Sequence, residues 1–122
     1  MKILLGVGGS ERSRRALEDT VERVQETGDE LAVAIFDAED VDATTTEIES
    51  DVRDVLDSAG VDAEIHRLSG HPAGDLVGLA DEGDFDRLVI GGGQRSPLGK
   101  IQLGSIAEFV ILNAETPVTL IR

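Results

Sequence analysis

The sequence predicts an α/β fold, a three-layer sandwich in which one five-stranded parallel sheet lies between two layers of helices. Short apolar runs alternate with amphipathic stretches along all 122 residues, a pattern typical of βαβ units. The apolar side chains are mainly Val, Ile, Leu and Ala, because the chain has three Phe, no Trp and no Tyr. Such side chains suit strands that are buried on both faces. No linker, repeat or low-complexity segment interrupts the pattern, so we expect residues 1–122 to form a single domain.

Strands and helices are expected in strict alternation. The predicted strands are the apolar runs Ile3–Val7, Leu31–Phe36, Val61–Leu68, Phe85–Ile90 and Pro117–Ile121. The predicted helices are Ser10–Thr27, a segment from the capping box at Thr44 to Gly60, a short helix from Pro72, and Ser105–Asn113. Right-handed crossovers leave few topologies, and all of them bring the loops after the first and fourth strands to one edge of the sheet. The expected strand order is 3-2-1-4-5. Open α/β sheets bind ligands at such an edge, where the strand order reverses.

The charge balance is strongly acidic. Twenty-five acidic residues against 11 basic ones give a formal net charge of −14 at pH 7. This charge repels phosphodiester backbones and anionic lipid, so we expect no binding to nucleic acid or to membranes. Two lysines against nine arginines, in an acid-rich chain, are typical of proteins from salt-loving organisms, in which salt screens the surface charge. A halophilic protein is therefore expected, with an ordinary acidic cytosolic protein as the alternative.

Several classes of site are disfavoured by residue usage. The chain has no Cys, which excludes disulfides and thiolate metal sites. No apolar run approaches the ~20 residues of a membrane span, and the charged first helix does not fit a signal peptide, so a cytoplasmic protein is expected. His66 and His71 lack the spacing of a metal-binding pair and are expected near opposite ends of the sheet. No serine lies in a G-x-S-x-G turn. We therefore predict no catalytic residue, no metal site and no enzymatic activity.

The turn Gly6–Ser10, after the first strand, is one candidate anion site. Glycines let backbone amides approach a ligand closely, and Ser10 begins a helix whose N-terminus carries free N–H groups and positive dipole charge. The turn is no dinucleotide fingerprint, because the third glycine of G-x-G-x-x-G falls on Glu11. A plain strand-to-helix turn with a serine cap explains the same residues, so both interpretations stay open.

The segment Gly91–Ser105 is the richer candidate. It leaves a strand through Gly91–Gly93, whose amides can form a concave nest for an anion. It then carries Arg95 and Lys100, two of the few cations, and ends at a helix start on Ser105. It is not a P-loop, because its Gly-Lys pair is followed by isoleucine. Long loops in small domains are usually functional, so we favour an anion site over a surface loop with solvated cations.

These residues resemble the signature of the universal stress proteins, which is Gly, two residues, Gly, nine residues and then Gly-Ser or Gly-Thr. Gly91 takes the first position and Gly104-Ser105 the last, with the nine-residue spacer 95–103 intact. The opening strand and its turn to Ser10, the segment Gly70–Ala73 and the closing strand are also similar to the family. The resemblance implies an adenine nucleotide α-hydrolase-like fold. With the acidic composition, it implies a small, haloarchaeal-type member with a single domain.

The resemblance also implies a function, namely a stress-response protein that binds ATP, AMP or another phosphate-bearing anion between the first and fourth strands. Magnesium is expected to accompany ATP. Family members commonly pair through the last strand, so a homodimer through Val118, Leu120 and Ile121 is expected. The residues expected at the nucleotide site are Gly8, Gly9, Ser10, Phe36, Gly91, Gly92, Gly93, Gln94, Arg95, Gly104, Ser105 and Ile106.

The sequence departs from the family pattern at two places in this site. Gln94 replaces the second signature glycine. Gly8 stands where nucleotide-binding members usually carry an aspartate that contacts adenosine, and Gly6 stands where the family has proline. Losing that carboxylate removes a hydrogen-bonding partner, so phosphate recognition is predicted more strongly than adenosine recognition. A dimeric interaction or regulatory module that binds no nucleotide stays open as an alternative, and an adenylyl-transfer enzyme is a weaker one.

Overall fold

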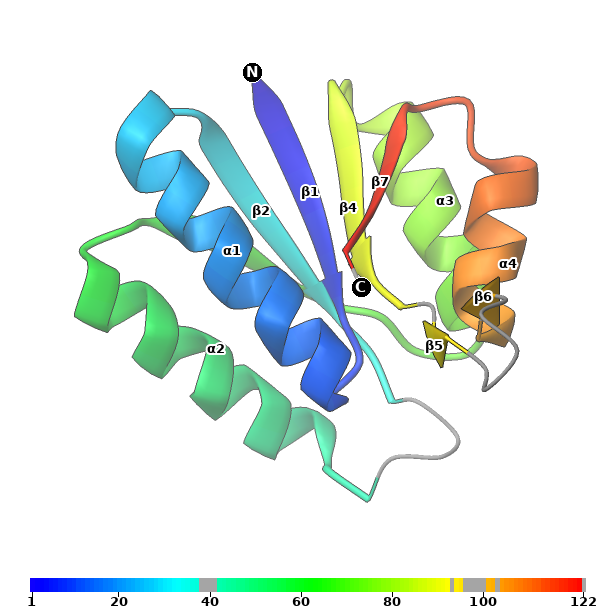
Figure 1. Cartoon of the computed structure of the whole chain (residues 1–122), viewed down its shortest axis with the longest axis horizontal. Coiled ribbons are helices and arrows are strands. Elements are labelled where there is room, and N and C mark those ends of the chain that lie inside the picture. Colours follow the sequence, from blue (N-terminus) through cyan, green and yellow to red (C-terminus); the bar gives the residue numbers. More distant parts are fainter. Residues whose placement is uncertain (38–41, 93, 96–100, 103, 122) are drawn as a thin grey trace.

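The computed structural model describes residues 1–37, 42–92, 94–95, 101–102 and 104–121, with the backbone alone for 94–95 and 101–102. Its main sheet has five parallel strands in the order β3-β2-β1-β4-β7 (Figure 1), which confirms the predicted order. The strands are β1 (Lys2–Val7), β2 (Glu30–Ile35), β3 (Ala63–Arg67), β4 (Arg87–Gly91) and β7 (Val118–Ile121). The two short strands β5 (Gln94–Arg95) and β6 (Ile101–Gln102) form a separate antiparallel pair that was not predicted from the sequence.

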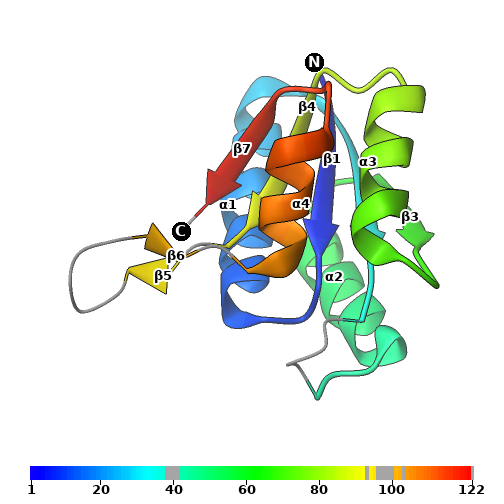
Figure 2. The ribbon, with the colours of Figure 1, turned by 90° about the vertical axis from the view of Figure 1, so that its right-hand side faces the viewer.

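Two helices cover each face of the sheet (Figures 1 and 2). The helices α1 (Glu11–Thr27) and α2 (Thr45–Ala59) lie on one face, and α3 (Pro72–Glu82) and α4 (Ser105–Asn113) lie on the other. Helices α1 and α2 begin at the predicted caps. The Ser10 side chain accepts a hydrogen bond from Ser13 N, and the Thr44 side chain accepts one from Glu47 N. No helix in the described part of the chain is long and apolar enough to cross a membrane.

Strand β1 supplies both halves of the core. Ile3, Leu5 and Val7 pack under α1 and α2, whereas Leu4 and two glycines face α3 and α4. Neighbouring side chains occupy the space at those glycines. A Cβ atom on Gly6 would lie 2.9 Å from Leu76 Cδ2, and one on Gly8 would lie 2.6 Å from Phe36 Cε2. Gly6 therefore lets Leu76 of α3 pack directly against the β1 backbone, and Gly8, just after β1, does the same for Phe36, just after β2.

Strand β3 is shorter than predicted. Its predicted first residue, Val61, instead donates its N–H to Leu56 O at 3.0 Å, and so belongs to the C-terminal cap of α2 around Gly60.

The prediction that the two histidines lie near opposite ends of the sheet is wrong. His66 is the fourth residue of the five in β3, and His71 caps α3, with its Nδ1 accepting a hydrogen bond from Gly74 N at 2.9 Å. Because α3 starts from the edge where β3 ends, both histidines lie at the carboxyl edge.

Asp81, near the end of α3, holds the connection between α4 and β7. Its carboxylate accepts hydrogen bonds from the hydroxyl and the amide of Thr116, at 2.7 and 3.0 Å, and from Glu115 N. The hydrogen bond from the Thr116 hydroxyl is the main cause that lowers the pKa of Asp81 below its ordinary value. These contacts position the start of the edge strand β7.

Candidate anion-binding site

The topology brings the two candidate loops together at the carboxyl edge of the sheet. Strands β1 and β4 are neighbours, but β1 leads through α1 to β2 on one side, and β4 leads through α4 to β7 on the other. The chain therefore leaves β1 and β4 toward opposite faces, the arrangement that in open α/β sheets forms a ligand-binding crevice between the two strand ends. We use the word crevice for this region at the carboxyl ends of β1 and β4. This is the position that the sequence predicted for the ligand.

Ser13 organises the turn after β1. Its Oγ accepts a hydrogen bond from Gly8 N at 3.2 Å and lies 3.1 Å from Ser10 Oγ, and its own N–H donates to Ser10 Oγ at 3.1 Å. Ser13 is 5% exposed, so these bonds are shielded from water. The Gly8 amide is therefore used within the protein. Ser13 was not predicted, because a serine inside a charged helix carries no sequence signal of such a role.

Gly91, at the end of β4, lies against the main chain of the first turn of α1. A Cβ atom on Gly91 would lie 2.6 Å from Arg12 C and 2.8 Å from Ser13 N. Main-chain atoms inside a helix cannot rotate away, so this approach requires glycine. The main chain of Arg12, whose side chain is exposed, therefore lies next to the end of β4. Arg12 was missed as a candidate cation, and its only sequence signal is its place two residues after the helix cap.

The start of α4 differs from the starts of the other three helices. Side chains of Ser10, Thr44 and His71 cap α1, α2 and α3, but the cap residue of α4 is Gly104, which makes no side-chain hydrogen bond. The first bond within α4 runs from Glu108 N to Gly104 O at 3.0 Å. The amides of residues 105–107 therefore have no helical partner, and they carry the positive end of the helix dipole.

Other predicted site residues have different roles. Phe36 is buried in the core with its ring on Gly8, and Ile106 is half-buried in the core beside α3. The predicted glycine nest is wrong at Gly92, whose N–H donates to Ile121 O at 3.0 Å and extends the sheet. Gln94 lies in β5, and Gly93 falls outside the described residues.

The remaining predicted site residues include two cations and the turn residue Gly9. Arg95 lies in β5, where the backbone alone is described, and Lys100 falls outside the described residues. Gly9 has a φ of +81° and packs against α2, where a Cβ atom would lie 2.9 Å from Ile48 Cδ1. The left-handed conformation of Gly9 therefore lets the turn pack closely against α2, on the side of the turn away from the crevice.

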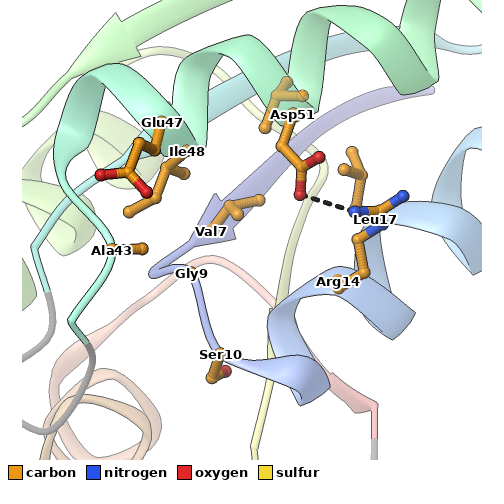
Figure 3. A pocket seen from close by; sticks show the side chains of 10 residues that line it. Val7, Gly9, Ser10, Arg14, Leu17, Ala43, Glu47, Ile48 and Asp51 are labelled. Carbon is orange, nitrogen blue, oxygen red and sulfur yellow. Dashed lines mark hydrogen bonds and ion pairs between the residues drawn. The ribbon is translucent and has the colours of Figure 1, made fainter.

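A cavity of about 310 Å³ lies on that far side of the turn, between α1 and α2 (Figure 3). Its lining includes the core residues Leu17 and Ile48. Its cation, Arg14, is held by Asp51 at 2.6 Å and by Glu18 at 3.1 Å, and the hydrogen bond to Glu18 is the main cause that raises the pKa of Arg14. Glu47 adds a further carboxylate to the lining. The cavity is therefore a poor site for a phosphate, unlike the start of α4.

Comparisons with known proteins agree over the whole chain. The sequence model of the Universal stress protein family matches residues 1–122. A universal stress protein of Mycolicibacterium smegmatis is 32% identical over 126 residues, which cover 98% of this chain and 96% of that protein. One of Methanocaldococcus jannaschii is 35% identical over 71 residues, which cover 58% of this chain and 42% of that protein.

Solved structures show the same fold. The universal stress protein of Archaeoglobus fulgidus is 31% identical, with a TM-score of 0.78 over 100% of this chain and 98% of that one. A universal stress protein in complex with cAMP is 28% identical, with a TM-score of 0.76 over 100% and 96% of the two chains. A universal stress protein from Archaeoglobus fulgidus in complex with dAMP is 29% identical, with a TM-score of 0.74 over 100% of this chain and 98% of that one. The chain belongs to the universal stress protein family.

Proposed function

We propose that this protein binds an adenine nucleotide, ATP or AMP, or another phosphate-bearing anion, in the crevice between β1 and β4. The uncapped start of α4 at Gly104 carries the proposal, because its amides and dipole suit a phosphate group. The complexes of related proteins with cAMP and dAMP support an adenine nucleotide as the ligand. In the family context, this binding would serve a response to stress.

The phosphates would accept hydrogen bonds from the free amides of residues 105–107 and from the hydroxyl of Ser105. Arg12, which is exposed in the first turn of α1 next to Gly91, is proposed to add positive charge, and Arg95 is proposed to do the same. Because the chain carries a formal charge of −14, Mg²⁺ on the phosphates would reduce the repulsion that opposes binding.

The substitution Gly104→Asp tests this site. The space around a Cβ atom at Gly104 is open, and its φ of −69° suits any residue. An aspartate would cap α4 with its own carboxylate, which should maintain or slightly raise the melting temperature. The same carboxylate would occupy the free amides and repel phosphate. We expect calorimetry with Mg-ATP in high KCl to show an affinity lower by about tenfold or more.

Gly104→Ala is the matched control, because it adds a Cβ atom without a charge or a cap. Its affinity for ATP should stay within about threefold of the original protein. If Gly104→Asp binds ATP as tightly as the alanine variant, the start of α4 is not the phosphate site.

We propose a binding role without catalysis. Both histidines have structural partners, since His66 Nε2 lies 3.4 Å from Glu64 Oε2 and His71 caps α3. The ring of His71 also lies edge-on to Phe109, with the ring centres 5.4 Å apart. Neither histidine is therefore placed as a general base for a ligand at α4. Sustained turnover of ATP with release of phosphate or pyrophosphate would contradict this proposal.

A homodimer through β7 is proposed as the assembly. β7 is an edge strand whose apolar side chains are half-buried. The carbonyls of Pro117 and Ile121 face β4, so the alternate residues Val118 and Leu120 present their backbone groups outward, where a second strand can pair. Leu112 on α4 is 74% exposed, and it adds apolar surface on the side of the sheet that α4 covers.

Leu120→Lys is expected to convert the dimer into a monomer, because a charge next to the paired edge opposes strand pairing. Size-exclusion chromatography with light scattering would measure the mass, and circular dichroism would show that the variant is folded. Glu64→Lys, on the opposite edge strand β3, is the control and should stay dimeric. A dimer that survives Leu120→Lys would place the interface elsewhere.

We also propose that the protein is halophilic and haloarchaeal in type, since its charge of −14 is spread over a chain of 122 residues. Screening of this charge by salt should stabilise the compact state. The melting temperature should therefore rise as KCl is raised to molar concentrations, and a melting temperature that is constant or falls would contradict the proposal. A cytoplasmic location stays a prediction.

A further inference from the structure

His71 joins the start of α3 to α4. Its Nδ1 accepts a hydrogen bond from Gly74 N at 2.9 Å, which caps α3. The ring lies directly on Gly74, where a Cβ atom would be 2.7 Å from Nδ1 and 3.3 Å from Cε1. The ring is also edge-on to Phe109 of α4, with the ring centres 5.4 Å apart and the ring planes at 63°. The lack of a side chain at position 74 therefore lets one imidazole ring contact both helices.

The hydrogen bond from Gly74 requires the neutral imidazole. A ring nitrogen accepts a hydrogen bond only through a free lone pair, so the proton of neutral His71 must be on Nε2. A second proton would put an N–H on Nδ1, where it would face the N–H of Gly74. The added positive charge would also lie at the positive end of the α3 dipole. Protonation of the ring therefore opposes the cap in two ways.

The charged groups described around His71 do little to offset this repulsion. Asp75 is one turn further along α3, but it is exposed, so water and salt screen its attraction for a protonated ring. Residues 68–70, before His71, carry no charge. The one charged residue of α4 is Glu108, which lies about 100° around the helix axis from Phe109. His71 itself is exposed, so its ring exchanges protons with the solvent.

We propose that His71 is a pH-sensitive cap that couples α3 to α4. The neutral ring caps α3 and packs against Phe109. Between about pH 8 and pH 5, the range in which histidine side chains take up a proton, the ring loses its hydrogen bond from Gly74, and its contact with α4 is lost with it. Acidification thus loosens the start of α3. The inference does not depend on ligand binding, so its failure would leave the proposed function unaffected.

Thermal unfolding of two proteins, both carrying His66→Gln, tests the proposal. The chain has two histidines, and protonation of His66 would act in the opposite direction, because its Nε2 is 3.4 Å from Glu64 Oε2. In this background His71→Asn keeps a capping side chain that takes up no proton near neutral pH. Acidification from about pH 8 to pH 5.5 at constant KCl should lower the melting temperature by about 3 °C or more relative to the His71→Asn protein. Equal changes in the two proteins would overturn the proposal.

Nuclear magnetic resonance of the unmodified protein tests the geometry without a substitution. At about pH 8 the ¹⁵N shifts of the His71 ring should show a proton on Nε2 and a free Nδ1. The amide signal of Gly74 should move with the same midpoint as the ring, and its exchange with solvent should be faster on the acidic side. A proton on Nδ1 in the neutral ring, or a Gly74 amide that does not follow the ring, would overturn the proposal.

Discussion

Gly91→Ala is expected to destabilise the fold by about 1–3 kcal/mol and to weaken ATP binding by about tenfold or more. The added Cβ atom would lie 2.6 Å from Arg12 C and 2.8 Å from Ser13 N, in the main chain of α1. Either the end of β4 or the first turn of α1 must move, and both border the crevice. Urea unfolding would measure the loss of stability, and calorimetry with Mg-ATP would measure the loss of affinity.

Gly92→Ala is the matched control for this prediction. A Cβ atom on Gly92 would meet only side chains, Leu120 Cδ1 at 3.2 Å and Ala107 Cβ at 3.3 Å, and these can shift by a few tenths of an ångström. We expect a loss below about 1 kcal/mol and an affinity within about threefold of the original. Equal effects of the two substitutions would contradict the role assigned to the contact between Gly91 and α1.

Phe36→Ala is expected to cost about 3–5 kcal/mol, because it removes a buried ring. Gly8→Ala alone should cost about 1–3 kcal/mol, since its methyl group would lie 2.6 Å from that ring. Together the two should cost less than the sum by about 1 kcal/mol or more, because the space left by the ring accepts the methyl group. Urea unfolding of the four proteins would give this coupling energy.

The control cycle pairs Phe36→Ala with Gly6→Ala. The nearest atoms to a Cβ at Gly6 belong to Leu76 and Ile90, so these two substitutions should be additive within about 0.5 kcal/mol. Additive costs for the Gly8 and Phe36 pair would show that the ring does not limit the space at Gly8.

The fold could be predicted from the sequence because its signals are local. Apolar runs bounded by glycines and capping residues appear within short windows, and the right-handed crossover rule then restricts the order of the strands. The error at Val61 arises because the cap of α2 extends one residue beyond Gly60. The error at His66 was avoidable, because a parallel strand that ends near Leu68 already places His66 at the carboxyl edge.

The sequence predicted some features of the proposed site and not others. The start of α4 at Gly104 follows from the spacing of the glycine signature, and the structure shows this start to be without a side-chain cap. The approach of Gly91 to α1 could not be predicted, because it joins segments that are nearly 80 residues apart in the sequence. The use of the Gly92 amide by β7 is likewise a contact between distant segments. Such contacts leave no periodic or compositional signal.

Nuclear magnetic resonance of the ¹⁵N-labelled protein, titrated with Mg-ATP in high KCl, tests the phosphate site most directly. Free amides that bind phosphate should show the largest chemical shift changes, so we expect these at residues 104–107, with smaller changes at Arg12 and Gly91 across the crevice. The amides around the cavity between α1 and α2, such as that of Asp51, should change little. Changes centred on that cavity, or none at 104–107, would contradict the proposed site.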